Sequence, residues 1–262
     1  MPSLRAMPRL SVIVITRNEA TRIRRCLESV AFADEIIVVD SGSTDDTVSI
    51  ARAMGAQVTQ TQDWPGFGPQ KNRALALASG DWFFSIDADE HVTPALRASI
   101  EAALREARFD AYSVSRKSSY CGQYMMHSGW YPDRVVRLAR RGTARFSDRL
   151  VHEKLEVRGA VGALEGELLH ESYADLQAVL DKVNRYSSAG AQSLAGRGVR
   201  GSLGKALGHG LWAFLRTYLF KCGFLDGRLG LVLAVSNAEE TYYRYLKLWL
   251  SQQVKPAGGH RD

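Results

Sequence analysis

The sequence predicts an α/β fold, in which helices flank a mostly parallel sheet and a helical, basic C-terminal extension follows. Two observations carry this prediction. Within the first 115 residues, short runs of β-branched and aromatic residues alternate with amphipathic stretches, and strands that alternate with helices in this way form parallel sheets. From Tyr173 onward the pattern becomes helical and rich in arginine and lysine.

Five runs are predicted to form strands. The runs 10–15 and 35–40 are rich in valine and isoleucine, which suits strands buried on both faces inside a parallel sheet. The other three runs have strand composition and follow at the spacing expected when helices connect parallel strands. The predicted strands are 10–15, 35–40, 56–61, 82–86 and 111–115.

Amphipathic stretches between these runs predict the connecting helices. In the stretch 21–30, Ile23, Leu27 and Val30 fall on one side, and this spacing gives a helix one face for the core. Further helices are predicted after Ser43 as the N-cap with Asp45 and Asp46 in the first turn, over 71–78 after a break at 66–69, and from Thr93-Pro94 to about 107.

The regular alternation loosens after residue 116, which indicates a change in organisation. The segment up to about 170 mixes short strands with arginine-rich loops, and amphipathic helices are expected over 175–186 and 237–250. We therefore expect an α/β domain over 1–172 and a helical region over 173–262.

The composition limits the classes of protein that fit. Of the 262 residues, 45% are hydrophobic and 24% are charged, which is ordinary for a globular chain and excludes wholesale disorder. The net charge of +6 indicates an anionic partner. The cysteines, Cys26, Cys121 and Cys222, are too far apart for a disulfide framework or a metal knuckle, which favours a reducing cytosol.

No apolar run is long enough to span a membrane. The longest candidates, 206–215 and 229–238, reach about ten residues each, whereas a membrane-spanning helix needs about 20. The run 10–15 is also too short for the core of a signal peptide. We therefore expect a cytoplasmic protein that either remains in solution or lies on a membrane.

Polar residues follow three of the predicted strands at the point where each strand ends. Ligands of parallel α/β sheets bind at the carboxyl ends of the strands. Asp87 and Asp89, two positions apart, can both face one cation, and Mg²⁺ or Mn²⁺ is commonly held by one or two carboxylates together with a diphosphate. The strand-end residues are Thr16, Asn18 and Glu19, then Asp40, then Asp87 and Asp89.

Four motifs in this order resemble those of family 2 glycosyltransferases, which have the Rossmann-like GT-A fold and bind nucleotide-sugars. A second, narrower resemblance is to the subgroup that includes lipopolysaccharide-core β-glucosyltransferases; it rests on 129–137, 151–153 and the helix with Lys182 and Tyr186. The four motifs are Val12-Ile-Val-Ile-Thr-Arg-Asn-Glu19, Ile37-Val-Val-Asp-Ser-Gly-Ser-Thr-Asp45, Lys71-Asn-Arg-Ala-Leu75 and Asp87-Ala-Asp89.

The resemblance implies that 1–172 is the nucleotide-sugar-binding and catalytic domain, and we expect 173–262 to contact the acceptor or a membrane surface. It also implies roles for individual residues. Asp89 would bind the metal directly, Asp87 would contact the ribose or the water shell of the metal, and a histidine beyond the motif, His170 or His152, would complete the coordination. The metal would take up charge as the diphosphate leaves. The residues implied in nucleotide-sugar binding are Thr16, Asn18, Glu19, Asp40, Lys71, Asp87 and Ala88.

An inverting transfer also needs a general base that deprotonates the acceptor hydroxyl. Related enzymes often supply it from a Glu-Asp pair after the metal motif, and no such pair occurs after residue 110. We assign the base to Glu153, with Asp133 and then Glu171 as the next candidates. Acceptor contacts are assigned to Trp130, Arg134 and Arg137.

The C-terminal part interleaves basic and aromatic residues. From 185 to 228 there are seven basic residues and the single acid Asp226, a pattern that suits a helix lying on anionic lipid. The charge also suits nucleic acid, but no nucleic-acid recognition motif is present, so we expect no nucleic-acid partner. The aromatic residues are Trp212, Phe214, Tyr218, Phe220 and Phe224, among Arg216, Lys221 and Arg228.

Together these features predict an inverting, metal-dependent glycosyltransferase at the inner face of the cytoplasmic membrane. It would move a hexose, with glucose favoured, from a UDP-sugar to a lipid-linked glycan such as a lipopolysaccharide core. One alternative is a metal-dependent nucleotidyltransferase, but such enzymes usually carry a glycine-rich loop and a lysine where this chain has Thr16-Arg-Asn-Glu19. The other is a non-enzymatic protein that binds anionic membranes or nucleic acid, which would leave the four motifs unexplained.

Overall fold

The computed structural model describes residues 8–147 and 153–253. The described chain divides into two compact units: the first lies within 1–117 and 133–170, and the second within 118–132 and 171–262. The second unit therefore takes in the segment 118–132, which the predicted boundary at residue 172 leaves in the first domain.

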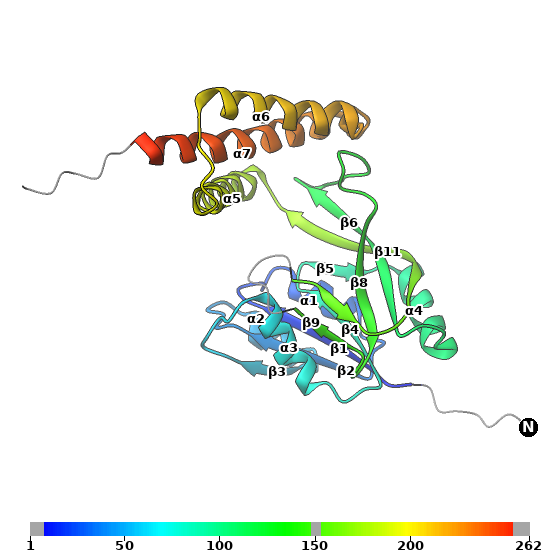
Figure 1. The fold of residues 1–262 in the computed structure, drawn as a ribbon. Coiled ribbons are helices and arrows are strands. Elements are labelled where there is room, and N and C mark those ends of the chain that lie inside the picture. Colours follow the sequence, from blue (N-terminus) through cyan, green and yellow to red (C-terminus); the bar gives the residue numbers. More distant parts are fainter. Residues whose placement is uncertain (1–7, 148–152, 254–262) are drawn as a thin grey trace, which may run out of the picture. The chain divides into compact units, whose positions relative to one another are not determined.

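The first unit is built on a parallel sheet, as the sequence predicts (Figure 1). Its strands are β1 (Leu10–Thr16), β2 (Glu35–Asp40), β3 (Gln57–Gln60) and β4 (Trp82–Asp87), in the order β3-β2-β1-β4. Strand β1 pairs in parallel with β2 on one side and with β4 on the other. Since the chain changes direction across the sheet at β1, the crevice beyond its carboxyl end is where such folds bind ligands.

Alternation along β1 distributes its side chains between two hydrophobic clusters. Val12 and Val14 belong to one cluster and Ile13 and Ile15 to the other, because successive side chains of a strand point to opposite faces. The first cluster includes residues of α1 (Ile23–Ser29), α2 (Thr47–Ala53) and α4 (Pro94–Glu106), and the second includes residues of α3 (Phe67–Leu77). Both faces of the sheet are therefore covered, which explains the nearly uncharged strands.

Beyond β4 the sheet continues with antiparallel pairing. Strand β8 (Asp133–Arg140) pairs antiparallel with β4 and with β6 (Ala111–Tyr120), and β11 (Val161–Tyr173) and β5 (Glu90–Val92) complete the order. The strand predicted at 111–115 forms, but it does not join the parallel part of the sheet. The chain turns back after β6, and the returning strand β8 occupies the place beside β4.

Two short strands lie outside this sheet. Strand β9 (Ala144–Phe146) pairs antiparallel with β10 (Leu155–Val157), and both contribute residues to the α3 side of the core. Strand β7 (Gln123–Tyr124), in contrast, belongs to the main sheet, where it pairs with the end of β6.

The predicted cap at Ser43 is wrong. Helix α2 begins at Thr47 with Asp46 at the N-cap position and no acidic residue in its first turn. The Ser43 hydroxyl instead donates to Asp40 and accepts from the backbone N–H of Asn18 at 2.8 Å. A contact between two loops therefore outweighs the local capping preference.

Helix α3 begins at Phe67, four residues earlier than predicted. Pro69 falls in the first turn, where proline is tolerated because the N–H groups there have no partner within the helix. The predicted break over 66–69 is therefore limited to one residue, Gly66, which has a φ of 110° and immediately precedes the helix.

The second unit is helical, as predicted. It contains α5 (Leu176–Gly196), α6 (Leu203–Leu215) and α7 (Gly227–Gln253), and α7 contacts both of the others. A π-helical turn, η1 (Arg216–Phe220), and a short 3-10 helix, η2 (Gly223–Asp226), connect α6 with α7. Among the described residues, every helix is too short or too polar to cross a membrane.

A buried carboxylate ties the segment 118–132 to these helices. Asp226 accepts hydrogen bonds from the backbone N–H groups of Met126 at 2.9 Å and His127 at 3.1 Å, and from the Ser128 hydroxyl at 2.8 Å. Because Asp226 and Ser128 are each only 6% exposed, the Ser128 hydroxyl would be buried without this acceptor, and the two backbone N–H groups would lose their bond to a carboxylate.

Replacement of this carboxylate should therefore destabilise the second unit. We expect Asp226→Ala to lower the free energy of unfolding by about 3 kcal/mol, because several donors lose their acceptor. Ser128→Ala removes one donor and should cost about 1 kcal/mol. Denaturant unfolding of both variants, followed by circular dichroism, measures the difference. Equal losses would contradict the role given to Asp226.

Candidate active site

The polar strand ends meet at one edge of the sheet, as predicted. In the paired strands, Thr16 lies opposite Asp40 and Ile15 lies opposite Asp87. The turn after β4 then holds Ala88 and Asp89 before β5 begins at Glu90. The sheet therefore brings together residues from three separate parts of the sequence.

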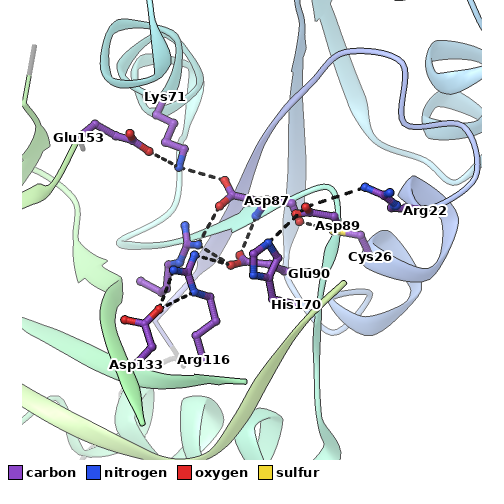
Figure 2. A network of polar contacts seen from close by, with 11 residues as sticks. Arg22, Cys26, Lys71, Asp87, Asp89, Glu90, Arg116, Asp133, Glu153 and His170 are labelled. Carbon is purple, nitrogen blue, oxygen red and sulfur yellow. Dashed lines mark hydrogen bonds and ion pairs between the residues drawn. The ribbon is translucent and has the colours of Figure 1, made fainter. Parts of the chain in front are cut away.

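Asp87 lies between two cations (Figure 2). Its Oδ1 is 2.9 Å from the Nζ of Lys71, and its Oδ2 accepts a hydrogen bond from the Nη2 of Arg137 at 2.8 Å. Burial alone would raise the pKa of this carboxyl, but Arg137 and Lys71 hold it well below its usual range. Asp87 is therefore a fixed anion whose two oxygens already have partners within the protein.

Glu90 is a site residue that the motif analysis did not identify. Its side chain is fully buried; Oε1 accepts from Arg137 at 2.6 Å and Oε2 accepts from the backbone N–H of Asp87 at 3.0 Å. Burial raises the pKa of Glu90, and the Asp87 charge adds to this effect. Burial by itself would lower the pKa of Arg137, but the two carboxylates raise it above its usual range. Arg137 thus remains charged and holds both acids in place.

Asp89 has a different set of neighbours. Its Oδ2 lies 3.3 Å from the Nε2 of His170 and 4.0 Å from Arg22 (Figure 2), and the side chains of Asp89 and His170 are 23% and 17% exposed. The structure therefore brings together two of the three predicted metal ligands, Asp89 and His170, while Asp87 is held by cations. His152, the alternative ligand, lies outside the described residues.

This pair of side chains fits a divalent cation bound together with a substrate. Among the described residues there is no group of three or more His, Cys, Asp and Glu side chains that could hold a metal on its own. Mg²⁺ and Mn²⁺ sites in nucleotide-binding proteins commonly combine one or two carboxylates with water and substrate phosphates. Asp89 and His170 would supply one oxygen and one nitrogen, and the remaining ligands would come from the diphosphate and water.

The loop after β1 is bound to the loop after β2. The Asn18 Oδ1 accepts from the backbone N–H of Thr44 at 2.8 Å, and the backbone N–H of Glu19 donates to the Thr47 hydroxyl at 2.8 Å. Asn18 itself adopts a left-handed backbone with φ of 56°, a conformation that asparagine tolerates better than most residues. Asp40 accepts from the backbone N–H groups that follow it, so the predicted nucleotide-binding residues also shape their own loop.

One buried polar group at this edge has no partner. The nearby Glu19 side chain is 27% exposed, and its partial burial raises its pKa. The Thr16 hydroxyl is buried and has no hydrogen-bond partner among the residues that the structure describes. Buried hydroxyls nearly always have a partner in proteins. An unpaired one at a strand end therefore marks a position where a ligand or water would donate or accept. Ala88, also buried, lines the turn between the two acids.

Lys71 connects the metal motif with the predicted base. It lies on α3, is 4% exposed, and its Nζ is 3.0 Å from the Glu153 Oε1 in addition to its contact with Asp87. Gly68, one turn earlier, makes this approach possible, because a Cβ at this position would lie 1.9 Å from the carbonyl oxygen of Ser147. The glycine therefore lets the helix carrying Lys71 lie against the backbone at Ser147.

The predicted acceptor residues do not form one cluster within a unit. Arg134 is exposed on β8, Arg137 on the same strand is buried between the two acids, and Trp130 belongs to the second unit. Of the alternative bases, Asp133 is bonded to Arg116 at 2.6 Å and Glu171 belongs to the second unit. The acceptor and base assignments stay predictions.

Comparison with known proteins identifies the family. The model of Glycosyl transferase family 2 matches residues 11–156. The lipopolysaccharide core biosynthesis glycosyltransferase LpsC of Rhizobium meliloti is 32% identical over 255 residues, which cover 90% of this chain and 93% of that protein. The chain belongs to glycosyltransferase family 2. An uncharacterized glycosyltransferase of Rickettsia prowazekii, RP128, is also 32% identical over 255 residues, covering 92% of this chain and 87% of that one.

Two solved structures are also similar to this chain. Residues 1–349 of S. aureus TarS give a TM-score of 0.47 at 16% identity, covering 94% of this chain and 91% of that one. Glucosyl-3-phosphoglycerate synthase from Mycobacterium tuberculosis, in complex with Mn²⁺, UDP-glucose and phosphoglyceric acid, gives 0.36 at 32% identity over 44% of this chain and 45% of that one.

Membership of the family confirms the predicted enzyme class. This family 2 glycosyltransferase has the expected GT-A fold with a helical C-terminal region. A nucleotidyltransferase and a non-enzymatic binding protein, the two alternatives drawn from the sequence, both conflict with that membership.

The buried arginine on β8 should be essential for the stability of this glycosyltransferase. We expect Arg137→Met to cost about 3–5 kcal/mol of unfolding free energy at pH 7.5, because it leaves the fully buried Glu90 and the partly exposed Asp87 without their shared cation. The loss should be smaller at pH 5, since burial raises the pKa of Glu90 and protonation then relieves the repulsion.

Arg134→Met is the matched control, because Arg134 lies exposed on the same strand. It should change stability by no more than about 0.5 kcal/mol. Urea unfolding at both pH values measures both variants. Similar losses for the two arginines would show that the buried ion pair does not hold the site together.

Proposed function

We propose that this glycosyltransferase moves a hexose, with glucose favoured, from a UDP-sugar to a lipid-linked glycan such as a lipopolysaccharide core, with inversion at the anomeric carbon. The observation that carries the proposal is that the two aspartates at the end of β4 have different neighbours. Asp87 is held by Lys71 and Arg137, whereas Asp89 lies beside His170. The similarity to LpsC supports the choice of acceptor class.

The nucleoside of the donor would lie over the carboxyl ends of β1 and β2. Thr16 offers a buried hydroxyl without a partner among the described residues, and Asn18 and Glu19 form the adjoining loop. Asp40 accepts from its own turn and, as a carboxylate, has further lone pairs for a uracil or ribose donor. These groups suit a polar, flat ligand better than an apolar one.

Asp89 and His170 would hold a Mg²⁺ or Mn²⁺ ion together with the diphosphate of the donor. When bound, such an ion polarises the diphosphate and takes up negative charge as it leaves. Asp87 would contact the ribose or the water shell of the ion. Lys71, close to Asp87, adds a positive charge near the same diphosphate.

Glu153 would act as the general base. It would take the proton of the acceptor hydroxyl as that oxygen attacks the anomeric carbon from the side opposite the leaving diphosphate. Its carboxylate is 3.0 Å from Lys71, which fixes its position in the structure. Arg134 is exposed on β8 and is suited to contact a negatively charged acceptor. Arg137, the other predicted acceptor residue on this strand, is buried, so its positive charge would attract the acceptor without direct contact.

Substitutions of Asp89 and Glu153 should fail in different ways. Asp89→Asn removes the charge of a metal ligand, so metal-dependent UDP binding and transfer should both fall. Glu153→Gln keeps the shape but cannot take a proton, so UDP affinity should persist while transfer drops about 10²–10⁴-fold. UDP affinity with Mn²⁺ and the transfer rate from UDP-glucose are the measurements.

Glu156→Gln is the matched control for the base, since Glu156 is exposed three residues further along the chain. It should leave both quantities unchanged. Near-normal transfer by Glu153→Gln would move the base to Asp133 or Glu171. If Asp89→Asn binds UDP and transfers normally, the metal assignment is wrong.

The second unit would place the enzyme on an anionic membrane, at the inner face of the cytoplasmic membrane. Leu207, Leu211 and Phe220, on α6 and η1, are 58%, 61% and 68% exposed. Leu203, Leu207 and Leu211 recur every four residues and therefore share one face of α6. Exposed apolar side chains of this size mark binding surfaces.

Basic residues accompany this apolar surface. Three basic residues are exposed here. Arg216 lies in η1, Lys221 lies between η1 and η2, and Arg228 lies at the start of α7. Of the predicted aromatic contacts, Trp212 and Phe224 are exposed, whereas Phe214 and Tyr218 stack on each other with ring centroids 5.5 Å apart. Apolar contact combined with positive charge favours anionic lipid over neutral lipid.

Vesicle binding should depend on both kinds of residue. Arg216→Gln and Arg228→Gln should each weaken binding to anionic vesicles about fivefold, because a basic residue near such a surface contributes about 1 kcal/mol. Leu211→Ser and Phe220→Ser should weaken binding to any vesicle. Arg105→Gln, on an exposed position of α4, is the control. Equal wild-type binding to neutral and anionic vesicles in a sedimentation assay would contradict the proposal.

A further inference from the structure

The second unit contains a pocket whose residues the proposed mechanism does not use. It lies between α5 and α7, next to the ends of β6 and β11, and has a volume of about 290 Å³ including the part open to solvent. Most of this volume is open to solvent, and the enclosed part has room for about one or two water molecules. A ligand would therefore lie against the open side of the pocket, as a single sugar ring can, and would not enter it as a long chain.

One side of the pocket is aromatic. The ring of Tyr120 is 5.8 Å from both Trp130 and Tyr173, and Trp130 and Tyr173 are 6.0 Å apart, measured between centroids. Tyr120 is buried and hydrogen-bonded to Ser236 on α7, whereas Trp130 and Tyr173 remain partly exposed. The rings support one another, so the two exposed ones are held in place before any ligand arrives.

The other side carries hydrogen-bonding groups of both charges. The Lys182 ammonium lies 4.6 Å from the centroid of Tyr173, and this contact keeps it at the edge of the pocket. Glu240 on α7 is bonded to Arg244, and Asn237 donates to the Thr217 hydroxyl at 3.2 Å. A cation, an anion and an amide around one small pocket can donate to and accept from the same ligand.

We infer that this pocket binds one pyranose ring of the acceptor glycan, away from the hydroxyl that is glycosylated. A pyranose has an apolar C–H face that packs on aromatic rings, and a rim of hydroxyl groups that both donate and accept hydrogen bonds. An acyl chain would instead leave Lys182 and Glu240 desolvated without new partners. The inference rests on the proposed function, since it names a part of the acceptor.

The test uses simple sugars as probes of the intact chain. Methyl glycosides of glucose, galactose, mannose and N-acetylglucosamine, and octanoate as an acyl-chain probe, are offered to the protein, and saturation-transfer NMR together with tryptophan fluorescence detects binding. At least one glycoside should bind. Trp130→Ala should weaken that binding at least tenfold and Lys182→Gln severalfold, while UDP affinity with Mn²⁺ stays unchanged in both variants.

Tyr243→Ala is the matched control, because Tyr243 is an exposed aromatic residue of α7 outside the pocket. It should leave glycoside binding unchanged. If Trp130→Ala shows a lowered melting temperature, Lys182→Gln decides the question, since its side chain lies at the pocket edge.

The outcomes separate the inference from the proposed function. Binding of UDP without binding of any glycoside, equal effects of the Tyr243 and pocket variants, or preferential binding of octanoate would overturn the inference and leave the proposed function standing. Glycoside binding without UDP binding would overturn the proposed function, and with it the acceptor role of the pocket.

Discussion

The site depends on one ionic cluster, in which the buried guanidinium of Arg137 joins the carboxylates of Asp87 and Glu90. Without this cation the two acids would repel each other, and the fully buried Glu90 would tend to take up a proton. Arg137 removes this problem by bonding to both through the same nitrogen, at 2.8 and 2.6 Å. The strand β8 has to lie beside β4 for this contact to form. The antiparallel part of the sheet is therefore a condition for the electrostatics of the site.

The same arrangement explains how two aspartates only two positions apart reach different surroundings. Asp87 is the last residue of a strand, where its oxygens meet Lys71 and Arg137, while Asp89 lies in the turn that follows, beside His170. A carboxylate already paired with two cations has less affinity for a third, whereas one beside a histidine can share a cation with it. Geometry thus distinguishes residues that the motif treats alike.

Local patterns in the sequence were sufficient for the parallel strands and for the strand-end residues, because both depend on composition over a few positions. Thr16, Asp40 and Asp87 meet as expected. Glu90 and Arg137 were not recognised as a pair, since they are 47 positions apart and meet only through the pairing of β8 with β4. Ser43 was misplaced for a similar reason: its hydrogen bond with Asn18 comes from another loop. The pocket in the second unit is lined by residues from four segments of the chain, so it could not be predicted from any single stretch of sequence.

The segment 118–132 belongs with the C-terminal helices, to which Asp226 ties it. The polypeptide consequently passes between the two units three times, near residues 117, 132 and 170. A helical region joined at a single point can be exchanged between related enzymes by one recombination event. This one cannot, because a chain cut after residue 170 would keep a hairpin that has lost its buried acceptor. Exchange of the second unit between related enzymes would therefore require coordinated change at two places in the gene.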